Sequence, residues 1–256
     1  VTIYWGGTDG LVPNRALVLA GPVEHVEQKD DALLPEVLEE AVPLVQVVEI
    51  PRPHVFVARC EHVELIPVGA DRRPGAPIEL ACPQAMAVST GDIKGSGSVD
   101  LVVACRQTCE EGERSWIYWA SERGFDESSR TPLNSRCACD VVVTDLDGDG
   151  CAEIILCQDK TDKSYTSESL VYRGGPDGIS RDPVRLLSHD ARRAFVARPD
   201  ASGLPQVVLV NHFARTCIDN VKSTIYFGGP DGYRPQRRLD VDGSGAVECI
   251  GCDIND

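Results

Sequence analysis

Short apolar runs separated by polar turns recur along this chain, and the clearest pair encloses an acidic loop. Valines fill positions 141–143 before the loop, and two isoleucines and a leucine fill positions 154–156 after it. β-Branched and apolar runs of this length are typical of short buried strands. Gly148 and Gly150 lie between the runs and permit a sharp turn. The pattern therefore predicts a β-hairpin over residues 141–157.

The loop of this hairpin is rich in side-chain oxygens. Asp145, Asp147 and Asp149 alternate with other residues, and Glu153 follows Asp149 after a short gap. Carboxylates at this spacing in a tight loop can converge on one point. Calcium takes about six to eight oxygen ligands, so these residues are candidate ligands of a hard cation.

The loop does not fit an EF-hand. That motif requires helices on both sides and an acidic residue at about loop position 12. Counted from Asp145, that position is Leu156, whose side chain carries no oxygen. The flanking apolar runs also favour strands over helices, so the EF-hand is excluded.

A tyrosine within a short apolar segment recurs at a fixed interval. Tyr118, Tyr172 and Tyr226 lie 54 residues apart in each case, and acidic loops recur in register with them. The turn sequence Gly-Gly-Pro-Asp-Gly follows two of the tyrosines. One period reads as four short strands, which is typical of a propeller blade. We therefore predict an all-β protein, a β-propeller of four-stranded antiparallel blades with about five blades represented.

The repeats divide the chain into units within one predicted domain, residues 1–256. The expected units are 1–43 (partial, with a helical insertion), 44–84, 85–137, 138–191, 192–245 and 246–256 (partial). The insertion is predicted from an amphipathic pattern between residues 22 and 42. Because the first and last units are incomplete, we expect either a piece of a longer protein or one blade shared between the termini.

These features resemble the FG-GAP or VCBS repeats, the β-propeller repeats of integrin α-subunits and of many bacterial surface proteins. The resemblance covers nearly the whole chain and is most specific over residues 141–157, which contain Asp-x-Asp-x-Asp-Gly-x-x-Glu. In that family the loop joins the first two strands of a blade and binds calcium. The resemblance implies Ca²⁺ ligands at Asp145, Asp147, Asp149 and Glu153, with the carbonyl oxygen of Cys151 as a further ligand.

Other acidic loops depart from this pattern. Weaker candidate ligands are Asp92, Ser96, Asp100, Asp253 and Asn255. Lys94 occupies the position equivalent to Asp147. Its ammonium group would repel a cation, or replace it by pairing with Asp92 and Asp100.

The aromatic residue after each repeated tyrosine is a candidate for ligand binding. Trp5, Trp119 and Phe227 occupy equivalent places, and aromatic faces are good apolar platforms for a sugar. Packing between repeats is the alternative for a residue that recurs once per unit. No catalytic residues are predicted, because the five histidines fall in no known catalytic pattern.

Composition limits the partners and the compartment. The net charge of −15 disfavours nucleic acid, which is bound mainly by neutralising its phosphates. No apolar run reaches the roughly 20 residues that cross a bilayer. Eleven cysteines and a calcium loop favour a secreted, cell-surface or periplasmic protein. Facing positions in the hairpin make Cys139 and Cys157 the first disulfide candidate, and the local pairs are Cys105 with Cys109 and Cys249 with Cys252.

Two classes of function remain open. The first is a calcium-stabilised propeller that serves as an extracellular binding or adhesion module for a protein or glycan. The second is the propeller portion of a secreted carbohydrate-active enzyme such as a polysaccharide lyase, as propellers of the resembling family sometimes are.

Overall fold

The computed structural model describes most of the chain after residue 44 and two short segments before it. The described residues are 2–4, 16–18, 45–50, 52–59, 61–71, 73–106, 114–122, 124–159, 164–197, 204–213, 221–229, 231–243 and 245–249. The predicted helical insertion lies outside them, as do Trp5, Asp253 and Asn255.

The described chain is all-β and antiparallel, and four sheets have four strands each. Sheet 1 holds β3 (Val45–Ile50), β4 (Arg52–Ala58), β5 (His62–Pro67) and β6 (Ile78–Ala81). Sheet 2 holds β7 (Ala85–Gly91), β8 (Asp100–Cys105), β9 (Arg114–Tyr118) and β10 (Arg130–Asn134). Sheet 3 holds β11 (Ala138–Thr144), β12 (Glu153–Gln158), β13 (Thr166–Tyr172) and β16 (Val184–His189). Sheet 4 holds β17 (Ala191–Ala197), β18 (Gln206–Asn211), β19 (Lys222–Phe227) and β20 (Arg238–Asp242).

Smaller elements complete the described fold. Two hairpins pair β1 (Thr2–Tyr4) with β2 (Ala16–Val18), and β14 (Gly174–Gly175) with β15 (Gly178–Ile179). A 3-10 turn, η1 (Glu127–Ser129), precedes β10. The all-β class and the four-stranded antiparallel sheets are therefore confirmed, as is the hairpin that β11 and β12 form around the acidic loop.

The strand β12 shows why its sequence is apolar at consecutive positions. All six of its residues are buried. Ile154 and Leu156 belong to a hydrophobic cluster shared with sheet 2, whereas Ile155 and Cys157 belong to a second cluster shared with sheet 4. Because successive side chains of a strand point to opposite faces, one unbroken run supplies two cores.

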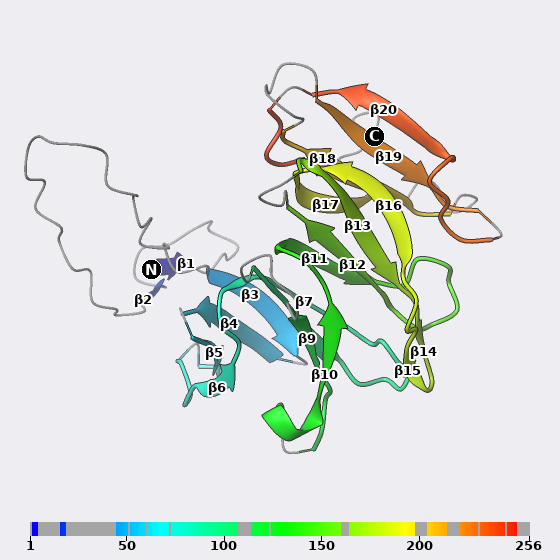
Figure 1. Ribbon diagram of the computed structural model, residues 1–256. Helices are drawn as coiled ribbons and strands as arrows, with labels where there is room; N and C mark the ends of the chain where they lie inside the picture. The colour runs from blue at the N-terminus through cyan, green and yellow to red at the C-terminus, as the bar shows by residue number, and fades with distance from the viewer. Residues whose placement is uncertain are drawn as a thin grey trace, which may run out of the picture.

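Consecutive sheets meet along their first strands, and Figure 1 shows the sheets following one another from β3 through β7 and β11 to β17. At each junction a side chain of one first strand accepts a hydrogen bond from a backbone N–H of the next. The acceptors and donors are Gln46 Oε1 and Val88 N (2.9 Å), Ser89 Oγ and Val143 N (3.0 Å), and Asp140 Oδ2 and Ala194 N (2.8 Å). The same kind of bond thus recurs at three junctions.

The repeated tyrosines bond each sheet to the last strand of the sheet before it. Each is buried, and its hydroxyl donates to a backbone carbonyl. The bonds join Tyr118 to Ala81 (3.0 Å), Tyr172 to Asn134 (2.6 Å) and Tyr226 to Leu187 (2.7 Å). A tyrosine at this position therefore buries its ring and satisfies its hydroxyl across a sheet junction.

An ionic cluster joins sheets 2, 3 and 4 at a second place. Asp159 follows β12, and its fully buried carboxylate pairs with Arg106, which follows β8, and with Arg192 of β17 at 3.6 Å. Arg192 also pairs with the buried carboxylate of Asp190 at 3.2 Å. These residues bring three sheets together through buried charge.

The expected disulfide between Cys139 and Cys157 is wrong. The register of β11 and β12 shifts between Ala138 and Asp140, so Asp140 pairs with Cys157 and Cys139 has no partner in the ladder. Its thiol instead lies 2.8 Å from the carbonyl oxygen of Ala191 in sheet 4. Cys105 and Cys249 are free thiols in the structure, which therefore forms neither of the two local pairs; Cys109 and Cys252 lie outside the described residues. Cys137 is disulfide-bonded.

Candidate metal site

The acidic loop leaves β11 after Thr144 and enters β12 at Glu153, and these two residues pair at the end of the hairpin that the loop closes. Gly148 and Gly150 adopt positive φ angles of 79° and 87°. Residues with a Cβ atom are disfavoured in that conformation. The glycines therefore allow the chain to turn back within a few residues.

Backbone N–H groups of the loop hold the carboxylates in place. Asp145 accepts hydrogen bonds from Gly148 N at 2.7 Å and Gly150 N at 3.0 Å. Asp147 accepts one from Asp149 N at 3.2 Å. One oxygen from each aspartate lies within 4.8 Å of the others. The structure thus brings together the three predicted aspartate ligands in a geometry that could hold a metal ion.

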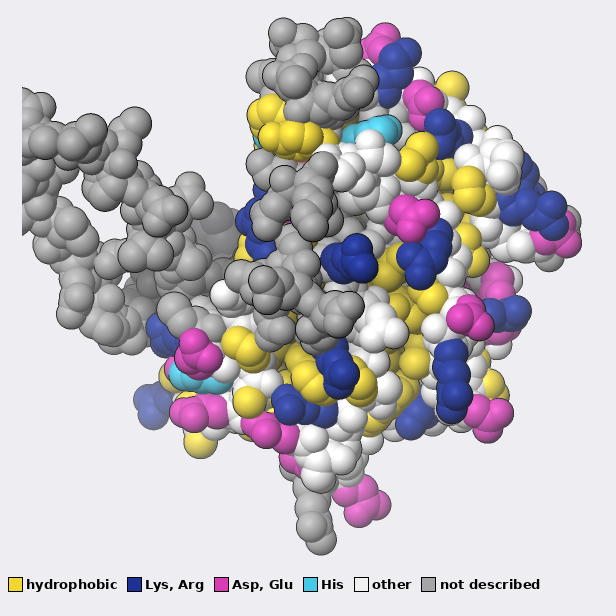
Figure 2. Space-filling view, viewed as in Figure 1, with side chains coloured by type: hydrophobic (Ala, Val, Ile, Leu, Met, Phe, Trp, Pro, Cys, Tyr) yellow, Lys and Arg dark blue, Asp and Glu magenta, His cyan; other side chains and the backbone are white. Residues whose placement is uncertain are grey.

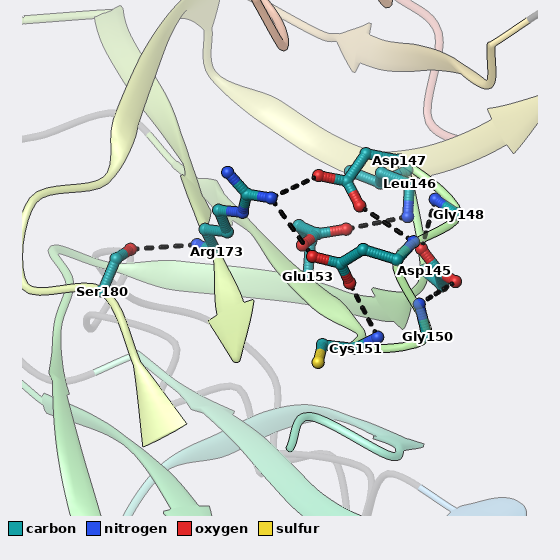
Figure 3. A network of polar contacts seen from close by, with 10 residues as sticks. Asp145, Leu146, Asp147, Gly148, Gly150, Cys151, Glu153, Arg173 and Ser180 are labelled. Carbon is teal, nitrogen blue, oxygen red and sulfur yellow. Dashed lines mark hydrogen bonds and ion pairs between the residues drawn. The ribbon is translucent and has the colours of Figure 1, made fainter. Parts of the chain in front are cut away.

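Glu153, the fourth predicted ligand, is buried directly beside the aspartates (Figure 3). Its Oε2 accepts a hydrogen bond from Leu146 N at 2.8 Å, but its buried Oε1 has no hydrogen-bond partner. The pKa of this carboxyl is raised to about 7, mainly by burial. The hydrogen bond from Leu146 N opposes this shift, and the charges of the three aspartates add to it. A buried oxygen without a hydrogen-bond partner destabilises the folded state. Binding a cation or a proton at Oε1 would remove this cost.

Cys151 lies at the end of the loop, where its N–H donates to Asp149 Oδ1 at 2.8 Å. This bond, followed by the charge of Arg173, lowers the pKa of Asp149. The thiol of Cys151 is free and buried. The carbonyl oxygen of Cys151 stays a predicted ligand.

Arg173 is a residue of this site that the sequence analysis missed. Its Nη2 lies 3.0 Å from Asp147 Oδ2 and 3.1 Å from Asp149 Oδ2. The contact between Arg173 and Asp147 can be followed in Figure 3. Ile154 pairs with Tyr172, the last residue of β13, so Arg173, which follows it, comes beside Glu153. Arg173 directly follows Tyr172, one of the repeated tyrosines. Its position after that tyrosine is the sequence feature from which its place at the site could have been predicted.

The equivalent positions of sheet 2 carry a different pair. Lys94 corresponds to Asp147, and Trp119 corresponds to Arg173. The Lys94 ammonium lies 3.9 Å from the centre of the Trp119 ring, a cation–π contact. The ion pair between Arg173 and Asp147 in sheet 3 therefore corresponds to the cation–π contact between Trp119 and Lys94 in sheet 2.

The Asp92 loop is closed by its own backbone. Asp92 accepts hydrogen bonds from Ser96 N at 2.9 Å and Gly97 N at 2.6 Å, while Asp100 accepts from Ile93 N and Ala120 N. The expected pairing of Lys94 with Asp92 and Asp100 is wrong, since among the described ion pairs Lys94 forms none. The Lys94 ammonium instead contacts the face of the Trp119 ring.

Trp119 and Phe227 differ in their surroundings. The Trp119 indole N–H donates to Thr131 Oγ1 at 2.8 Å, and the ring packs against the cluster shared by sheets 2 and 3. Phe227, at the end of β19, is an exposed aromatic residue. Packing thus accounts for Trp119, and ligand binding by either residue stays a prediction.

Comparison with protein-family models and with curated proteins found no relative of this chain. Within the described ranges, none of the helices has the length and hydropathy needed to span a bilayer. The class supported so far is an all-β protein of antiparallel four-stranded sheets with a possible acidic metal site.

The raised pKa of Glu153 predicts how the stability of the metal-free protein depends on pH. The folded carboxyl has a pKa of about 7 against an ordinary 4.5, so the folded state binds this proton more tightly. Protonation of Glu153 therefore stabilises the folded protein fully below about pH 4.5. This stabilisation, about 3 kcal/mol, is lost as the pH rises through about 7. Glu153→Gln should remove it.

The measurement is urea unfolding of both proteins in chelator across this pH range. Glutamine keeps an acceptor for Leu146 N and carries no charge. Because other groups titrate in the same range, the difference between the two proteins is the relevant quantity. Parallel pH profiles would contradict the prediction.

Proposed function

We propose that this chain is a calcium-binding β-propeller of the FG-GAP/VCBS type that serves as an extracellular binding or adhesion module for a protein or glycan. The propeller is supported by four consecutive four-stranded sheets that meet along their first strands. Recurrent hydrogen bonds at three junctions, from backbone N–H groups and from tyrosine hydroxyls, give further support. Such repetition is expected when one unit packs on the next.

The observation that carries the metal assignment is the unpartnered buried Oε1 of Glu153 beside three clustered aspartates. The donors are all oxygens, which suits hard cations. The number of carboxylates favours calcium over the smaller magnesium, which keeps several waters and is bound through one or two carboxylates. When bound, calcium would be held by Asp145, Asp147, Asp149 and Glu153. Its charge would stabilise the ionised form of Glu153 and hold the β11–β12 hairpin closed.

Arg173 is the competitor of this ion for the aspartates. Its guanidinium contacts two of the three carboxylates, and its side chain is 65% exposed. A long exposed arginine can leave the site at low cost, whereas Glu153 cannot. We therefore expect Arg173 to weaken calcium affinity without abolishing it.

Calorimetric titration with calcium tests the site. Asp147→Asn should weaken the affinity by at least about 10-fold, because a charged ligand is lost. Arg173→Ala should strengthen it several-fold, because the competing cation is removed. Asp92→Asn lies in the loop that carries Lys94 in place of the second aspartate; it is the matched control and should bind like the wild type. Failure of the wild type to bind calcium at millimolar concentration would refute the proposal.

The proposed compartment follows from the same features. Calcium sites outside cells need only bind at millimolar ion concentrations, and the disulfide at Cys137 requires oxidising conditions. On the face shown in Figure 2, basic and acidic side chains of the described residues intermingle. With a net charge of −15, this surface suits a protein or glycan partner better than nucleic acid.

The binding function is tested on glycan and protein arrays, with calcium and with chelator. Retention that requires calcium and leaves the bound glycan intact would support a binding module. New reducing ends or unsaturated products from a polysaccharide panel would support the enzyme alternative. Absence of retention on both arrays would count against the module.

A further inference from the structure

Two buried thiols face each other across the junction between sheets 1 and 2. Cys82 directly follows β6, the last strand of sheet 1, and Cys105 ends β8 of sheet 2. Their sulfur atoms are 2.8 Å apart, and both residues are fully buried. They belong to the hydrophobic cluster that these two sheets share.

The segment that carries Cys82 is fixed to sheet 2 by polar contacts. The carbonyl oxygen of Ala81 accepts hydrogen bonds from Tyr118 Oη at 3.0 Å and from Arg130 Nη1 at 2.8 Å. On the other side, Cys105 N donates to Ser115 Oγ at 3.2 Å. The two cysteines are therefore held face to face by bonds on both sides of the junction, independently of their own contact.

We propose that Cys82 and Cys105 form a disulfide that covalently links sheet 1 to sheet 2 in the oxidised protein. The oxidant is a second disulfide, such as glutathione disulfide or the disulfide of a thiol oxidase. One cysteine thiolate attacks it to form a mixed disulfide and releases one thiol. The other cysteine then attacks the mixed disulfide and releases the second thiol, so two electrons and two protons leave the pair.

The surroundings decide when this reaction occurs. Hydrogen bonding to Cys82 and burial both raise the pKa of the Cys105 thiol, so the folded pair holds little thiolate. The thiolate is the reactive form. We infer that the bond forms during folding, before the sheets close over it, and is afterwards protected from reductants.

Peptide mapping without reduction tests the bond directly. The protein is produced in an oxidising compartment, its free thiols are alkylated in denaturant, and it is cleaved with trypsin. Cleavage after Lys94 places Cys82 in peptide 73–94 and Cys105 in peptide 95–106, while Cys109 lies in 107–114. We expect peptides 73–94 and 95–106 to be linked. Alkylation of both cysteines, or linkage of 95–106 to 107–114, would overturn the proposal.

Stability provides a second measurement. A bridge that closes a loop of 23 residues should raise the Tm of the oxidised protein by on the order of 5–10 °C over protein refolded in reductant. Cys82→Ala/Cys105→Ala should lose most of this difference. Cys139→Ala, which removes another buried thiol, is the matched control and should keep it. The reductant must be added to unfolded protein, because the folded bridge is expected to resist it.

Discussion

Replacing Asp159 by alanine is expected to lower the free energy of unfolding by about 3 kcal/mol. The carboxylate is fully buried between Arg106 and Arg192. Its removal takes this counter-charge from Arg106 and leaves Arg192 with the carboxylate of Asp190. The side chains of these arginines are 40% and 29% exposed, so water can partly solvate them. For this reason we place the loss at the lower end of the range for a broken buried ion pair.

Urea unfolding followed by circular dichroism measures this loss. Glu168→Ala is the matched control, because its ion pair with Arg185 lies on the surface at 3.0 Å. Exposed pairs contribute little, so this change should stay within about 0.5 kcal/mol. An Asp159→Ala protein as stable as the control would show that the cluster does not hold the three sheets together.

Calcium is expected to raise the stability of the folded chain by about 4 kcal/mol when its free concentration is 1,000 times the Kd. The ion binds the ordered loop and not the unfolded chain, in which the carboxylates are far apart. For a protein of this size the gain corresponds to a rise of roughly 8–16 °C in Tm. Chelator should remove the rise, and Asp145→Asn should make melting insensitive to both calcium and chelator.

Differential scanning calorimetry makes this comparison in one series. Asp145 is the informative position, because it accepts two backbone hydrogen bonds that asparagine can partly keep. The loop should therefore still fold in the variant, so that lost metal binding is separated from lost structure. A wild-type melting temperature that does not respond to chelator would contradict the calcium assignment.

The hairpin was predictable from the sequence because an inner strand such as β12 fills two cores and is therefore apolar at consecutive positions. The runs at 141–143 and 154–156 are apolar at consecutive positions, and the hairpin of β11 and β12 follows from them. The three aspartates converge because their spacing is local and the glycines permit the turn. Local sequence was sufficient for both features.

Other features depended on contacts that spacing does not reveal. Arg173, which directly follows the third strand of the sheet, contacts two of the aspartates. Asp159 pairs with arginines from two other sheets. The Cys139–Cys157 pairing failed because a one-residue register shift turns Cys139 toward Ala191. The alternation of inward and outward side chains along a strand does not reveal where such a bulge occurs, so a single sequence does not predict it.

The division of β12 between two hydrophobic clusters has a consequence for how the protein comes apart. Ile154 and Leu156 pack in the cluster shared with sheet 2, and Ile155 and Cys157 pack in the cluster shared with sheet 4. Detaching either sheet would therefore expose the side chains on one face of β12 to water. Damage to sheet 3 should therefore spread in both directions, and we expect native-state hydrogen exchange to show sheets 2, 3 and 4 opening as a single cooperative unit.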